Sequence, residues 1–118
     1  LAKELSALRN KGVLIVGSGN MVHNLGMIAW DKLNEPEYGF DWAHEINAAF
    51  KKNISERNFD ALINYENLGT ASKLAIPTPD HYCPMIYSLG LIEKNEDISF
   101  FNDKAVGGSL TMTSFKAE

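Results

Sequence analysis

The sequence is poor in cysteine and in positive charge. Its one cysteine, Cys83, cannot form a disulfide within the chain. Because no secretory signal is visible either, we expect a reducing compartment and predict the cytoplasm. The 15 acidic residues outnumber the 11 basic residues, which gives a formal net charge of −4. The basic residues are also scattered, so we expect neither a nucleic acid nor a membrane as partner.

Charge is absent from one long stretch, Gly12 to Trp30, which contains no Asp, Glu, Lys or Arg. This stretch is not predicted to cross a membrane, because the segments Gly17–Asn20 and His23–Asn24 would leave polar groups in lipid. The whole sequence is 45% hydrophobic and 22% charged, which is typical of one ordinary globular domain. It begins in what looks like a helix already under way, so we expect it to be part of a longer protein.

The same uncharged stretch contains the feature around which we expect the fold to be organised. The residues from Val13 to Val16 are apolar and mostly β-branched, and a Gly-Ser-Gly turn follows them directly. This pattern predicts an interior strand, buried on both faces, that ends where the backbone must come close to something. His23 follows the turn, and α/β proteins place ligands and chemistry beyond the carboxyl ends of such strands.

Hydrophobic periodicity predicts the other elements, which are helices over 1–9, 40–54, 57–67 and 84–89, a helical turn over 71–75, and strands over 98–101 and 110–115. Three leucines share one face of the first helix, and Ser55 is expected to cap the third. The segment 76–84 contains three prolines and is predicted to be a stiff loop. The predicted fold class is α/β, with a mixed central sheet flanked by helices.

Two histidines stand out, His23 beyond the predicted strand and His81 on the stiff loop. Imidazole is a common ligand of zinc and non-haem iron, so the pair indicates a metal site, although two histidines are a weak signal by themselves. Asp80 could be a carboxylate ligand or could form a hydrogen bond within the loop. Cys83 could be a nucleophile or sulfur ligand, or a small apolar residue at a helix start. Nucleotide binding is a weaker alternative, because the glycine turn lacks the third glycine of the dinucleotide fingerprint and the lysine of a P-loop.

Taken together, four motifs resemble one known family. They are the segments Gly12–Leu25, Phe40–Trp42, Pro77–Pro84 and Ser109–Phe115. The family is that of the class III (LigB-type) extradiol ring-cleavage dioxygenases, in the DOPA 4,5-dioxygenase-like branch. The resemblance extends over essentially all 118 residues but only over the carboxyl-terminal part of the family's domain. It therefore implies that residues 1–118 are an incomplete part of one α/β domain.

The resemblance implies a chemistry and a role for four residues. In that family a non-haem Fe(II), often found as Zn(II) in isolated proteins, binds a catechol such as DOPA together with O2. By resemblance, His81 is a metal ligand, and His23 is a further ligand or the catalytic acid and base. Ser18 and Tyr82 are expected to contact the substrate. Two more ligand histidines are implied in an amino-terminal part that this sequence does not contain, so we expect the 118 residues alone to be inactive.

A competing hypothesis belongs to another class of protein. In this hypothesis the chain is a non-catalytic half-domain that acts as an interaction module. It would form a homo-oligomer through an exposed sheet edge, because unpaired backbone groups at such an edge readily pair with another chain.

Overall fold

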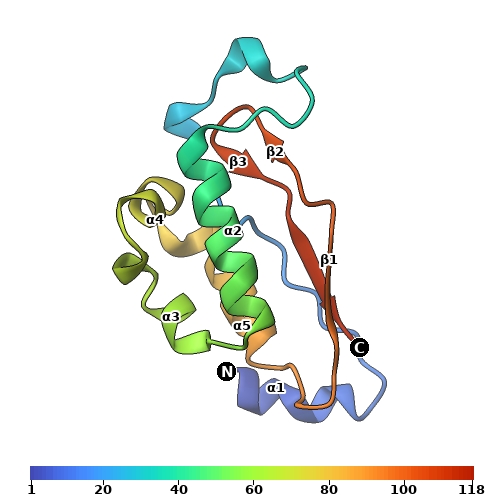
Figure 1. Ribbon diagram of the computed structural model, residues 1–118. Helices are drawn as coiled ribbons and strands as arrows, with labels where there is room; N and C mark the ends of the chain where they lie inside the picture. The colour runs from blue at the N-terminus through green and yellow to red at the C-terminus, as the bar shows by residue number, and fades with distance from the viewer.

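The computed structural model describes all 118 residues (Figure 1). It confirms the α/β class. The elements are α1 (Ala2–Arg9), α2 (Asp41–Ser55), α3 (Phe59–Ile63), α4 (Thr70–Ala75), α5 (Cys83–Leu89), β1 (Ile98–Phe101), β2 (Ala105–Val106), β3 (Leu110–Thr111) and β4 (Ser114–Ala117). None of the helices has the length and apolar character needed to span a membrane.

Helix α2 is the centre of the packed part of the molecule. Its residues Ala43, Ile46, Phe50 and Ile54 are all buried and recur every three or four positions, as a helix with one apolar face requires. Figure 1 shows α3 and α4 on one side of α2 and the strands on the other. Burying a large apolar side chain stabilises a fold by about 1.5–3 kcal/mol, so this face of α2 is a main source of stability. The predicted helix over 40–54 is confirmed.

The helix predicted over 57–67 is interrupted. Helix α3 ends at Ile63, and a separate 3₁₀ helix follows over Tyr65–Leu68. Between them Asn64 has a non-helical ψ of 43°, and its side-chain amide donates a hydrogen bond to the Asp60 carbonyl at 2.9 Å. Asparagine competes in this way with the helical backbone, which explains the break. The expected cap, Ser55, is instead the last residue of α2.

The strand predicted over 110–115 is divided into β3 and β4. Strand β3 pairs with β2, and β4 pairs with β1, both antiparallel, with Phe100 opposite Phe115. Between β3 and β4, Thr113 is buried, and its hydroxyl lies 2.8 Å from an oxygen of Asn47 on α2 and 2.9 Å from one of Asp103. These contacts hold the link between the two strands against α2. The sheets are therefore two small antiparallel pairs, and the predicted mixed central sheet is not formed by these residues.

The prediction that Val13–Val16 is a buried interior strand is wrong for this chain. Leu14 is 85% exposed and Val16 is 76% exposed. No backbone N–H or C=O group from Leu14 to Gly19 takes part in a hydrogen bond. A strand exists through pairing with neighbours, and no segment of the 118 residues pairs with this one. A groove of about 750 Å³ lies beside it instead, bordered on its far side by Phe101 and β4.

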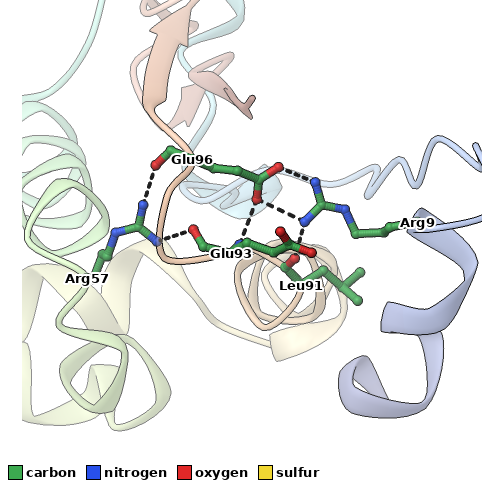
Figure 2. Close-up of polar contacts among 5 residues, drawn as sticks. All are labelled: Arg9, Arg57, Leu91, Glu93 and Glu96. Atoms are coloured by element: carbon green, nitrogen blue, oxygen red, sulfur yellow. Dashed lines mark hydrogen bonds and ion pairs between the residues drawn. The ribbon is translucent and has the colours of Figure 1, made fainter.

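Helix α1 is attached by charge and not by its apolar face. None of its residues is buried, and of the three leucines predicted on one face only Leu5 and Leu8 belong to the helix. Figure 2 shows how Arg9 reaches the loop before β1, where it donates to the Leu91 carbonyl at 2.5 Å and pairs with the Glu96 carboxylate. On the other side of this loop, Arg57 donates to the carbonyls of Glu93 and Glu96. The hydrogen bond from Arg9 is the main reason that the pKa of Glu96 is lowered to about 2.

Candidate functional site

The structure brings His23 and His81 together. Their rings stack face to face, with centroids 3.6 Å apart and planes inclined by 10°. His23 forms an isolated antiparallel bridge with Leu110, and its N–H donates to the Ala75 carbonyl at 2.9 Å. His81 ends a short 3₁₀ helix that begins at Pro79. Two segments far apart in the sequence thus form one site, as expected, while the roles of the two histidines stay predictions.

The glycine turn makes this approach possible. The N–H of Asn20 donates to the His81 carbonyl at 2.8 Å, and a Cβ atom on Gly19 would lie only 2.2 Å from the same oxygen. A Cβ atom on Gly17 would lie 2.7 Å from the Pro84 carbonyl oxygen at the start of α5. Glycine is therefore needed at both positions, because any larger residue would push the turn away. The predicted close approach of the backbone is confirmed, and its partner is the His81 loop of the same chain.

A carboxylate lies beside the imidazole of His81 on the loop side, and a hydroxyl holds that carboxylate. Nδ1 of His81 lies 2.9 Å from a carboxylate oxygen of Asp80, and the Thr78 hydroxyl donates to the other oxygen of Asp80. The hydrogen bond from Thr78 is the main reason that the pKa of Asp80 lies below its usual value. Of the two interpretations of Asp80, the structure contains the hydrogen bond within the loop.

His23 is partly buried. Burial lowers the pKa of His23 below its usual 6.5, and the positive form of the nearby His81 lowers it further. The neutral imidazole is therefore favoured at neutral pH. A neutral imidazole has a free lone pair, which is the form that binds a metal or accepts a proton.

The residues present meet the needs of a metal only in part. Imidazole is a suitable donor for Fe(II) or Zn(II), but no group of three or more His, Cys, Asp or Glu side chains that could hold a metal ion is found. The stacking also matters, because the lone pairs of parallel rings lie in parallel planes. One ion about 2 Å from a nitrogen of each ring could not lie in both ring planes. One of the two rings must therefore turn before both bind the same ion.

The hydroxyl groups of Ser18 and Tyr82 do not lie at the two imidazoles. Ser18 is exposed on the glycine turn. Tyr82 is only 2% exposed, and its hydroxyl donates to the Leu62 carbonyl at 2.8 Å in the core beneath α2. Burial raises the pKa of Tyr82 well above its usual value. Its packing gives it a structural role, so contact of either residue with substrate stays a prediction that the geometry does not support.

Two asparagines that bracket His23 are part of the site and were not singled out from the sequence. The side-chain amide of Asn20 donates to the Thr111 carbonyl at 2.8 Å, and that of Asn24 donates to the Leu74 carbonyl at 2.8 Å. They fix the segment that presents His23 between β3 and α4. The available signal was the presence of two amides in a long stretch without charge, where each amide must find a partner.

Comparison with known proteins confirms the predicted resemblance. No family model matches the chain. Over almost all of its residues, however, the chain is similar in sequence to a part of proteins named as extradiol dioxygenases, the class that its motifs indicated.

The particular relatives carry the name 4,5-DOPA dioxygenase extradiol. The one from Escherichia coli K12 is 34% identical over 97% of this chain, and the one from Beta vulgaris is 26% identical over 98%. The crystal structure of an uncharacterized protein from Escherichia coli K12 covers 97% of this chain, with a TM-score of 0.84 and 34% identity. The chain spans 42% of the length of both named relatives and 46% of the solved chain.

Proposed function

We propose that this chain is part of an extradiol dioxygenase that opens the ring of a catechol such as DOPA with O2. The observation that carries the proposal is the pair of contacting imidazoles, His23 and His81, in a chain similar to proteins named for that activity. The cytoplasm stays the predicted compartment, because the single cysteine suits a reducing environment.

The two histidines have separate roles in this proposal. His81 would hold the metal, Fe(II) or Zn(II), together with ligands from outside these residues. When bound, the metal would supply Lewis acidity and open positions for the catechol oxygens and O2. His23 would serve as a second ligand or as the group that accepts and returns a proton at a ring nitrogen. The neutral form favoured by its lowered pKa suits both roles.

The 118 residues supply only part of the machinery. Two imidazoles are fewer than the three or more protein ligands that such ions usually take. The named relatives are more than twice as long as the matched region, since that region is 42% of each. We propose that the unmatched, amino-terminal length supplies the other ligands and covers the exposed segment Val13–Val16. The chain alone is accordingly expected to have little or no dioxygenase activity.

The alternative function is a non-catalytic half-domain that associates through its open side. The observation in favour of it is the same exposed segment, whose backbone groups from Leu14 to Gly19 are unpaired. Such a segment is a template for strand pairing with a second copy. This alternative predicts a concentration-dependent dimer of the 118-residue chain and no effect of either histidine on any bound metal.

The test uses substitutions of both histidines in a polypeptide of the relatives' full length. His81→Ala is expected to lower bound metal and to abolish ring opening of DOPA together, because losing one imidazole weakens the site. If His23 mainly transfers protons, His23→Gln should keep most metal and slow turnover by about 10²–10⁴-fold. The control is His44→Gln, because His44 is exposed on α2 outside this pair. Unchanged metal content and turnover in both His23 and His81 variants would contradict the proposal.

A further inference from the structure

We propose that Asp80 is a positioning residue that sets which nitrogen of His81 carries the proton. Its carboxylate, 2.9 Å from Nδ1, keeps the neutral imidazole protonated there and leaves the lone pair of Nε2 free. Nε2 is then the atom with which His81 meets a metal or substrate. This inference rests on the proposed role of His81 and adds a residue and an atom to it.

The geometry of the loop carries the inference. Asp80 and His81 are adjacent, and adjacent side chains usually point apart, yet Nδ1 and a carboxylate oxygen are 2.9 Å apart. The 3₁₀ helix Pro79–His81 makes this possible, since Pro79 fixes the backbone at its first position. Thr78, just before this helix, donates to the second carboxylate oxygen and so restricts the rotation of the Asp80 side chain.

A carboxylate that lies beside one ring nitrogen has a known consequence for histidine ligands. The nitrogen that faces a carboxylate retains the proton, and the opposite nitrogen becomes the more basic donor. The alternative tautomer would place the Nε2 proton where a ligand bond must form, and it would leave Nδ1 without a proton to donate to Asp80. The carbonyl of His81 is held as well, by the N–H of Asn20. Backbone and ring of His81 are thus both oriented before any ligand arrives.

Because the Asp80 carboxylate is exposed, it needs Thr78 as a second partner to stay in place. The Asp80 side chain is 63% exposed and that of His81 is 44% exposed, so water competes for the contact. A carboxylate free to rotate would spend much of its time hydrogen-bonded to water. Because Thr78 holds one oxygen, the other is kept facing Nδ1. Thr78 is therefore expected to act on His81 only through Asp80.

The tautomer of His81 can be measured directly, without metal or substrate. In ¹⁵N-labelled 118-residue protein at a pH where the imidazoles are neutral, long-range ¹H–¹⁵N NMR should show the His81 proton on Nδ1. Asp80→Ala should convert this signal to a mixture of the two tautomers. Thr78→Val, which leaves both Asp80 and His81 in place, should cause the same change to a smaller extent. Asp80→Asn, whose amide oxygen can still accept, should restore most of the Nδ1 form.

A second experiment measures the affinity of the same protein for Zn(II) by titration, with no substrate present. Asp80→Ala is expected to weaken the affinity about 10-fold, as outer partners of ligand histidines commonly do. The control Asp60→Ala removes the same charge from an exposed position on α3 and should change neither tautomer nor affinity. A wild-type proton on Nε2, or a tautomer unchanged by Asp80→Ala, would overturn the inference. If instead the tautomer responds but His81→Ala leaves Zn(II) binding intact, the positioning stands and the proposed metal role of His81 fails.

Discussion

The helical layer around α2 and the segment Val13–Val16 are both rich in apolar side chains, and only the first buries them. Phe50 of α2 is fully buried, whereas Leu14 is 85% exposed. The difference lies in the backbone. A helix satisfies its own hydrogen bonds and needs only something to cover one face, while a strand needs neighbours on its edges as well. A part of a domain can therefore complete its helices and leave its strands without partners.

The largest expected contrast between these two regions is in stability. Phe50→Ala should lower the free energy of unfolding by about 3–5 kcal/mol, because it leaves a cavity in the core beneath α2. Leu14→Ala removes an apolar side chain that contacts little, so it should change stability by no more than about 0.5 kcal/mol. Urea denaturation of the 118-residue variants measures both. Equal losses for the two variants would show that Leu14 is buried and would remove the distinction between the regions.

A smaller effect is expected where the open segment meets the helical layer. Gly19→Ala would place a Cβ atom 2.2 Å from the His81 carbonyl oxygen, so the turn and the His81 loop must separate. We expect a loss of about 1–3 kcal/mol in the free energy of unfolding, as for other overpacked sites, and loss of the ring stacking between the histidines. Ring-current shifts of the imidazole protons report the stacking. Gly26→Ala is the matched control, since its Cβ atom would be 3.4 Å from its nearest neighbour.

The smallest effect concerns the attachment of α1 through Glu96. The carboxylate has an ordinary pKa of 4.5 in the unfolded chain and one of about 2 in the fold, chiefly because Arg9 donates to it. The unfolded state therefore binds more protons between these values, so the contribution of Glu96 is present above pH 4.5 and is lost as the pH falls toward 2. Glu96→Gln should flatten the dependence of stability on pH in this window. If the Glu96→Gln variant keeps the wild-type dependence of stability on pH, other carboxylates cause that dependence.

The sequence was sufficient for α2 and for the approach of the two histidines. The apolar spacing of Ile46, Phe50 and Ile54 predicted α2, and the two glycines before His23 predicted a close backbone approach. Propensity alone did not reveal the break at Asn64, which depends on one side-chain hydrogen bond. It also could not show that Val13–Val16 is unpaired, because periodicity identifies a strand by its faces and carries no information about which neighbours are present. Nor could it show that the Tyr82 hydroxyl donates to the Leu62 carbonyl in the core, because that contact depends on tertiary packing.

Amide hydrogen exchange along Leu14–Gly19 tests the central claim, that this segment is a strand of a larger domain whose partners lie outside the 118 residues. In the 118-residue protein these amides have no hydrogen-bond acceptor and should exchange within the fastest class, while amides of α2 near Phe50 are protected. In a polypeptide of the relatives' full length, the same amides should become protected to the level of the core. Protection already in the 118-residue protein at low concentration, or fast exchange in the longer one, would contradict the account.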